Sequence, residues 1–251
     1  MLRGHTSGGS LVLLAAIISG VHLQRHDSSV QLTSESEAQI YRPILEPSET
    51  TPQIGTYILK NQVGEPCIKA TMGVEYIVIE KKNGWFLNLE PSRVRTSGLC
   101  GQQAAVLSLT LPDNATSLQL TFTQENNLFY VTTLTSHVSP LPICPGCANK
   151  TYSGLVAHRK LFTAANGQSF KCKSESMFVM SPELQIKLVP LQVQAFTLPK
   201  GQYGTEVECW ADYNKRVIPI CFGATVVGLI LMVVLTYLFV KDRRRQGYDR
   251  L

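Results

Sequence analysis

The chain has 251 residues, of which 44% are hydrophobic and 16% are charged, a composition that suits one sizeable folded domain with accessory segments. Its formal net charge is +5, but the last eleven residues alone hold five Lys and Arg against two Asp. Because the excess positive charge is concentrated in this tail, the sequence gives no support to a nucleic-acid partner.

The N-terminus has the pattern of a secretory signal peptide. Arg3 precedes the apolar run LVLLAAIISGV at residues 11–21, which is too short to span a bilayer. Small residues at the end of this run offer a cleavage site. We predict that residues 1–22 form the signal peptide, the alternatives being a retained anchor or a core helix.

The next segment, residues 23–53, is rich in Ser, Thr, Glu and Pro and shows no apolar periodicity. A segment of this kind does not bury enough apolar surface to offset its loss of conformational entropy on folding. We therefore predict that residues 23–53 form a short flexible stalk.

From residue 54 onward, apolar and polar residues alternate with a period of two. In SLQLTFT, Leu118, Leu120 and Phe122 alternate with polar residues, as in a half-buried strand. A short helix fits only near residues 152–165, so we predict an all-β domain of two packed sheets over residues 54–214. Similar alternation occurs at residues 74–80, 85–90, 105–111, 128–134 and 184–196.

Six of the seven cysteines lie between the two apolar segments, and an even number of cysteines behind a signal peptide predicts disulfides. The sequence alone leaves their connectivity open. Local pairing of Cys67 with Cys100 and of Cys172 with Cys209 would close two loops of similar size. The remaining two are Cys144 and Cys147.

Cys144 and Cys147 lie in the loop SPLPICPGCANK, which is rich in Pro and Gly. A CxxC pair is redox-active where its first Cys begins a helix, whereas a rigid loop favours a local disulfide. A zinc site would need two further ligands at a matching spacing, and none stands out. A thiol oxidoreductase using this pair is the one enzymatic alternative; otherwise we predict no enzymatic activity and no cofactor.

Two sequons are present, Asn114-Ala115-Thr116 and Asn149-Lys150-Thr151, and neither has Pro at its middle position. Both fall in predicted loops, where a glycosyltransferase has access. We predict N-glycosylation at Asn114 and Asn149.

The second apolar segment carries no formal charge between residues 218 and 240 and is long enough for the ~30 Å hydrocarbon core of a bilayer. We predict a transmembrane helix over residues 217–240. Basic residues follow it at once, and the positive-inside rule then places the C-terminus in the cytosol, a type I topology. Ala224 and Gly228 form a small-xxx-small pair through which two such helices could associate.

The predicted cytosolic tail, residues 241–251, ends in Tyr248-Asp249-Arg250-Leu251, the pattern of Tyr, any two residues and a bulky apolar residue. An extended peptide of this kind adds a strand to the edge of a sheet while Tyr and Leu fill two pockets. With Gly247 before the Tyr and the membrane nearby, we predict that Gly247, Tyr248 and Leu251 form a sorting motif. The alternative is a solvated tail that only anchors the span.

The motifs GTYILKNQVGEPCIKATMG, NLEPSRVRTSGLCG, LTFTQENNLFYVTTL, SFKCKSES, LQVQAF and VECWAD, with the span and tail that follow, resemble the lysosome-associated membrane glycoprotein family. The similarity runs from about Gly55 to Leu251. It implies a β-prism lumenal fold, the disulfides Cys67–Cys100 and Cys172–Cys209, and Tyr248 and Leu251 as adaptor-binding residues. The CxxC pair is not part of the four-cysteine pattern of this family.

The resemblance implies a type I glycoprotein of lysosomal and late endosomal membranes with a structural and trafficking role in immune-cell endolysosomes. It would pass through the cell surface and early endosomes. The implied partners are the medium subunit of a clathrin adaptor complex, membrane lipid, further copies of the chain and other members of the family. The competing prediction is a cell-surface adhesion or scavenger receptor.

Overall fold

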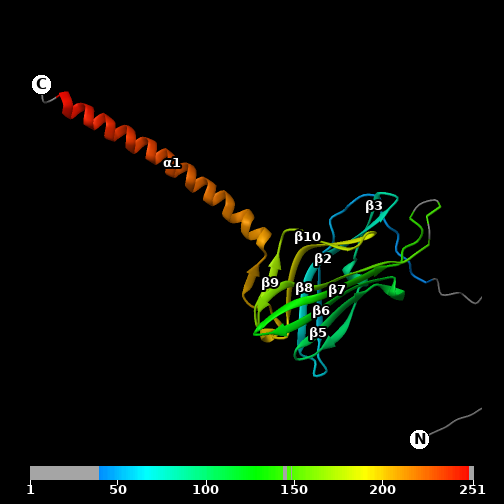
Figure 1. The fold of residues 1–251 in the computed structure, drawn as a ribbon. Helices are drawn as coiled ribbons and strands as arrows, with labels where there is room; N and C mark the ends of the chain where they lie inside the picture. The colour runs from blue at the N-terminus through cyan, green and yellow to red at the C-terminus, as the bar shows by residue number, and fades with distance from the viewer. Residues whose placement is uncertain (1–39, 144–145, 148, 249–251) are drawn as a thin grey trace, which may run out of the picture. The chain divides into compact units, whose positions relative to one another are not determined.

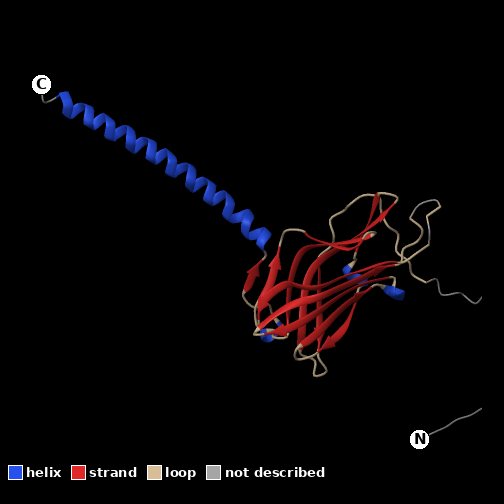
Figure 2. Cartoon of the chain, viewed as in Figure 1, coloured by secondary structure: helices blue, strands red, loops and turns tan. Residues whose placement is uncertain are grey.

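The computed structural model describes residues 40–143, 146–147 and 149–248, and within them the chain forms strands β1 to β12 followed by one long helix, α1 (Figure 1). Strands account for nearly all regular structure before α1, as Figure 2 shows in red. The predicted fold class, an all-β domain of two disulfide-linked sheets with one apolar helix, is confirmed.

The larger sheet has seven strands in the order β1-β2-β11-β9-β12, with β3 paired to β2 and β10 paired to β11. All neighbours are antiparallel except β9 and β12, which run parallel. The strands are β1 (Gly55–Lys60), β2 (Pro66–Glu80), β3 (Asn83–Asn88), β9 (Ser169–Cys172), β10 (Ser176–Ser181), β11 (Leu184–Ala195) and β12 (Glu206–Glu208).

The smaller sheet has five antiparallel strands in sequence order. They are β4 (Arg95–Cys100), β5 (Ala104–Thr110), β6 (Thr116–Glu125), β7 (Leu128–Val138) and β8 (Tyr152–Ala165). Consecutive strands joined by short turns pair most readily as a meander, and the Asp and Asn residues at positive φ in the β5–β6 and β6–β7 turns meet the backbone demand of tight turns.

One hydrophobic core lies between the two sheets. Leu118, Leu120 and Phe122 of β6 are fully buried, as the alternating pattern predicts, and they belong to the same cluster as Met72 and Tyr76 of β2. Because successive side chains of a strand point to opposite faces, one face of each sheet packs into this core.

Residues 152–165, where a short helix was considered, form β8 instead. The strand pairs with β7 through two register shifts, and His158 and Phe162 take positive φ values of 58° and 55° inside it. Relative to β7, strand β8 has one extra residue between Leu161 and Ala164 and two extra residues between Ala157 and Leu161, and such bulges disturb the alternation between the two faces. The period-two pattern by which strands are recognised is therefore lost, although the strand itself is long.

The prediction of a flexible stalk over residues 23–53 is wrong for its described part, residues 40–53, which we call the N-terminal strap. Leu45 is 5% exposed and packs in the core, and Glu46 exchanges two main-chain hydrogen bonds of 2.8 Å with Phe86 of β3. Pro52 packs over Gly73 of β2, where an added Cβ would lie 3.1 Å from the proline ring and would collide with the main-chain oxygen of Val189. The strap is ordered because it packs on the larger sheet and pairs with β3. Its residues are therefore buried without the apolar periodicity of a strand or helix. Residues 23–39 lie outside the described residues.

A buried ion cluster lies beneath the strap. Lys187 of β11 is 2% exposed and contacts both Glu75 of β2, which is fully buried, and Glu49 of the strap. Burial alone would lower the pKa of Lys187, but its hydrogen bonds to the two carboxylates outweigh that effect and the pKa lies above its usual value. The strap thus supplies one of the two carboxylates that compensate a buried ammonium.

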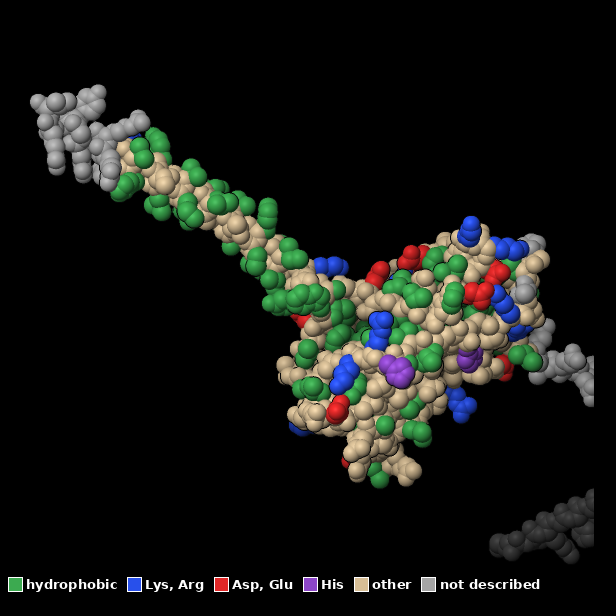
Figure 3. All heavy atoms as spheres, in the orientation of Figure 1, with side chains coloured by type: hydrophobic (Ala, Val, Ile, Leu, Met, Phe, Trp, Pro, Cys, Tyr) green, Lys and Arg blue, Asp and Glu red, His purple; other side chains and the backbone are tan. Residues whose placement is uncertain are grey.

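Helix α1 spans Trp210–Tyr248 and is longer than the predicted span of residues 217–240 at both ends. Its segment Trp210–Lys241 has a mean hydropathy of 2.7, and its most apolar window is not buried against the rest of the described chain. Figure 3 shows apolar side chains in green along the helix. By length and composition α1 is able to cross a bilayer.

Candidate functional site

Two disulfides hold the β domain together and hold the chain directly before α1 to it. Cys67 at the start of β2 bonds to Cys100 at the end of β4, with Cα atoms 6.0 Å apart, and so links the two sheets. Cys172 at the end of β9 bonds to Cys209, with Cα atoms 5.1 Å apart, directly before α1. These are the pairs that the family resemblance implies.

The first turn of α1 is docked on the loop after β9. Asp212 accepts hydrogen bonds from the main-chain N–H groups of Lys173 at 2.5 Å and Ser174 at 2.9 Å, and from the Ser174 hydroxyl at 2.5 Å. Lys215 donates to the same hydroxyl at 3.0 Å. Together with the Cys172–Cys209 disulfide, these bonds fix the start of the helix to the β domain. Cys172, Cys209 and Asp212 also lie close together, but the disulfide leaves no thiolate for a metal ion.

The charge of Asp212 is stabilised within this junction. Burial alone would raise the pKa of its carboxyl, but hydrogen bonds from Ser174 and the main chain hold that pKa below the ordinary value of 3.8. A carboxyl with a depressed folded-state pKa contributes stability above its unfolded pKa and loses it as the pH falls through the folded value. We therefore expect the hydrogen bonds of Asp212 to persist at mildly acidic pH.

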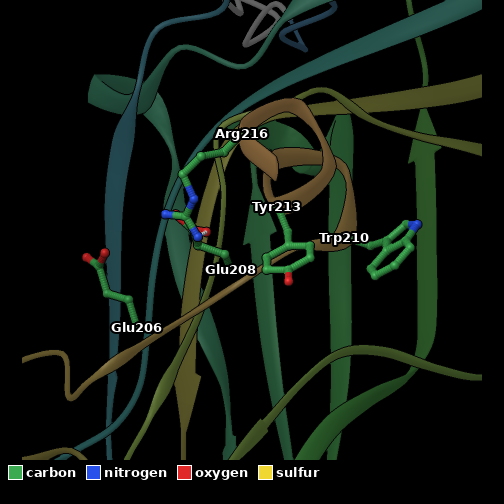
Figure 4. Close-up of a pocket in the computed structure, with 5 residues that line it drawn as sticks. All are labelled: Glu206, Glu208, Trp210, Tyr213 and Arg216. Atoms are coloured by element: carbon green, nitrogen blue, oxygen red, sulfur yellow. Dashed lines mark hydrogen bonds and ion pairs between the residues drawn. The ribbon is translucent and has the colours of Figure 1, made fainter. Parts of the chain in front are cut away.

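An open hollow of about 730 Å³ lies beside this junction, lined by the side chains drawn in Figure 4. Arg216 forms an ion pair of 2.8 Å with Glu208, and the rings of Trp210 and Tyr213 stack with centroids 5.8 Å apart. Trp210 is 74% exposed and Tyr213 44% exposed. Exposed aromatic rings at the start of an apolar helix suit the interface between water and lipid headgroups.

Both predicted glycosylation sites are exposed. Asn114 lies in the turn between β5 and β6 with φ 54°, and Asn149 lies in the loop between β7 and β8. Exposure permits a glycan at either position. Glycosylation at Asn114 and Asn149 stays a prediction.

The CxxC loop is described in part. Cys147 is disulfide-bonded, and Cys144 lies outside the described residues. The local disulfide between Cys144 and Cys147 and its redox alternative both stay predictions.

The tail differs from the extended peptide on which the sorting prediction depends, because α1 continues through Gly247 and Tyr248. Lys, Arg and Gln are strong helix formers, so the composition of the segment KDRRRQ favours continuation of the helix. Leu251 lies outside the described residues, and the sorting motif of Gly247, Tyr248 and Leu251 stays a prediction.

Sequence reasoning missed the junction residues Asp212 and Ser174 and the buried pair Lys187 and Glu75. Asp212 gives one local signal, an acidic residue in the first turn of a helix. The other three stand at ordinary strand or loop positions, and only the three-dimensional arrangement shows what they contact.

Comparison with known proteins places these features in a family. The family described as lysosome-associated membrane glycoprotein 2-like, luminal domains, matches residues 42–210. Lysosome-associated membrane glycoprotein 3 of Rattus norvegicus is 32% identical over 242 residues, which are 95% of this chain and 56% of the rat protein. Its Homo sapiens counterpart is 30% identical over 223 residues, 87% of this chain and 51% of that protein. The chain thus spans about half the length of these relatives.

Solved structures agree with the sequence comparison. The crystal structure of human lysosome-associated membrane protein 3 covers 62% of this chain and 99% of its own, with a TM-score of 0.57 and 29% identity. The membrane-proximal domain of mouse lysosome-associated membrane protein 1 covers 64% of this chain with a TM-score of 0.55, and at 24% identity this likeness concerns the fold alone. The match over residues 42–210, which include most of the strap and every strand, shows that the chain belongs to the lysosome-associated membrane glycoprotein family.

Proposed function

We propose that this chain is a type I glycoprotein of lysosomal and late endosomal membranes with a structural and trafficking role and no catalytic one. In this proposal residues 1–22 are removed, the β domain with glycans at Asn114 and Asn149 faces the lumen, and residues 217–240 span the bilayer. The protein would reach lysosomes after transit through the cell surface, and it would act in the endolysosomes of immune cells.

The observation that carries the proposal is α1, an apolar helix that is long enough to cross a bilayer. It begins at the C-terminal end of the β domain that matches the family, and a basic tail follows its apolar part. The positive-inside rule then favours a cytosolic C-terminus. The junction supports a structural role, since Asp212 and the Cys172–Cys209 disulfide hold the β domain directly at the start of the helix. No flexible linker separates the two.

We propose further that the tail binds the medium subunit of a clathrin adaptor complex through Tyr248 and Leu251. Binding by strand addition requires an extended peptide, so the last turn of α1 must unwind. That turn holds Gly247, which is about 1 kcal/mol less favourable in a helix than Ala, and helix ends fray easily. Unwinding therefore costs little compared with filling two side-chain pockets.

Tail peptides covering residues 241–251 test this partner. Burying a Tyr or Leu side chain contributes about 1.5–3 kcal/mol, so Tyr248→Ala or Leu251→Ala is expected to weaken binding to the purified adaptor medium subunit by about 10- to 100-fold. Isothermal titration calorimetry measures the Kd. Arg250→Ala, at a position that no pocket is expected to read, is the matched control and should bind like the parent. Equal affinity of all four peptides would rule out the sorting motif.

A further inference from the structure

The outer face of the five-stranded sheet carries an open hollow of about 560 Å³ across β5, β6, β7 and β8. Apart from Gly154 and Leu155, its lining is made of hydroxyl, amide and imidazole side chains, and no Lys, Arg, Asp or Glu is among the lining residues. Most exposed sheet faces carry charged residues, so an uncharged polar hollow is suited to a neutral polar ligand.

The pairing of the strands places these side chains together. Ser108 of β5 lies opposite Gln119 of β6, which lies opposite Thr135 of β7, and Ser117 lies opposite His137 one step along. Residues directly opposite one another share a face of the sheet. Their strand neighbours point into the core, so the row of polar groups faces outward.

Asn114, the first residue of a sequon, is itself part of the lining. The imidazole Nε2 of His137 lies 2.8 Å from the Asn114 main-chain oxygen, and its Nδ1 lies 2.8 Å from the Ser117 hydroxyl. The main-chain N–H of Ser139 also donates to the Ala115 carbonyl at 2.7 Å. These contacts hold the attachment point of the predicted glycan at the edge of the hollow.

We propose that this hollow seats the first sugars of the N-linked glycan carried by Asn114. The inference rests on the glycosylation proposed above. Sugar hydroxyl and acetamido groups are neutral donors and acceptors, and the Ser, Thr, Gln and His side chains of the lining offer both roles without the cost of desolvating a charge. The covalent link raises the effective concentration of the sugar to the millimolar range or above, so weak contacts suffice.

Asn149 provides an internal comparison. It is exposed like Asn114, but it is not among the residues that line the hollow. A glycan at Asn149 is expected to project into solvent.

Enzymatic deglycosylation of the full chain in its native state tests whether the Asn114 glycan contacts the hollow. The protein is produced in mammalian cells, purified in detergent and treated with an amidase that removes N-glycans, and release at each site is followed by glycopeptide mass spectrometry. We expect the Asn114 glycan to be released roughly tenfold more slowly from the folded than from the denatured protein. The reason is that weak contacts between the tethered sugars and the hollow should limit access of the amidase to the glycan linkage. The Asn149 glycan should show little difference.

Two variants test whether slow release comes from contacts of the glycan with the hollow or from general shielding of the linkage by the folded protein. Gln119→Ala removes a central polar group of the hollow and should abolish the protection at Asn114. Thr121→Ala, on the same face of β6 but outside the hollow, should leave it intact. Equal native and denatured rates in the parent, or protection that survives Gln119→Ala, would overturn the seat while leaving glycosylation standing.

An absence of glycan at Asn114 would instead overturn the glycosylation proposal and the seat with it. Asn114→Asp removes the attachment and keeps a residue type that tolerates φ 54°. Binding of a free N-glycan oligosaccharide to this variant but not to the glycosylated parent would support the inference, whereas association of the glycosylated parent with a second copy through the hollow would overturn it.

Discussion

Replacing Lys187 with methionine is expected to lower the free energy of unfolding by about 3–5 kcal/mol, because it leaves the carboxylate of Glu75 buried without a counter-charge. Glu75 is fully buried and Lys187 is 2% exposed. The pKa of Lys187 is raised, so its ammonium is charged at neutral and acidic pH and its contribution is lost only at strongly alkaline pH. Urea unfolding of the detergent-solubilised chain measures the change.

Two further variants test the cause. Lys160→Met removes the ammonium of an exposed pair with Glu125 and should change the stability far less, since solvent screens that pair. Combining Lys187→Met with Glu75→Leu removes both buried charges and should recover much of the loss. If Lys187→Met is no more destabilising than Lys160→Met, the buried cluster does not hold the strap and sheet together.

The double variant Cys172→Ser with Cys209→Ser is expected to cost about 4 kcal/mol, the loop-closure value for a disulfide of this span. Because a domain has only about 5–15 kcal/mol in total, the variant should be retained in the endoplasmic reticulum. Its glycans would then stay sensitive to endoglycosidase H. Cys221→Ser alters an exposed thiol within α1 and is the matched control, which should mature normally. Normal maturation of the double variant would show that this disulfide is dispensable.

Sequence periodicity predicted the regular strands well. In β6, apolar and polar residues alternate from Leu118 to Thr123, and the burial of their side chains follows the same alternation; in β5 the burial alternates along the whole strand. It failed for β8, where His158 and Phe162 interrupt the pleat, and for the strap, where Leu45 and Pro52 pack without any repeat. Hydrophobic periodicity reveals buried residues only where they recur at the regular spacing of a strand or a helix.

The residues of the candidate site also fall into those that the sequence reveals and those that only the fold brings together. Cysteines and sequons are recognised from residue type and spacing, whereas Asp212 and Ser174 are 38 residues apart and meet only because β9 and the start of α1 are neighbours. The buried pair of Lys187 and Glu75 is similarly a product of the β2–β11 register, in which these two residues lie directly opposite one another. Such contacts follow from the fold and not from a local motif.

The steady-state location of the full chain tests the central claim most directly. We predict that the parent and Arg250→Ala colocalise with lysosomal markers by fluorescence microscopy, while Tyr248→Ala moves mainly to the plasma membrane. Both variants keep the β domain and α1, so a difference between them isolates the tail. A parent chain that resides at the cell surface, or a Tyr248→Ala variant that remains lysosomal, would contradict the proposal that this is a lysosomal membrane glycoprotein sorted by its C-terminal tyrosine motif.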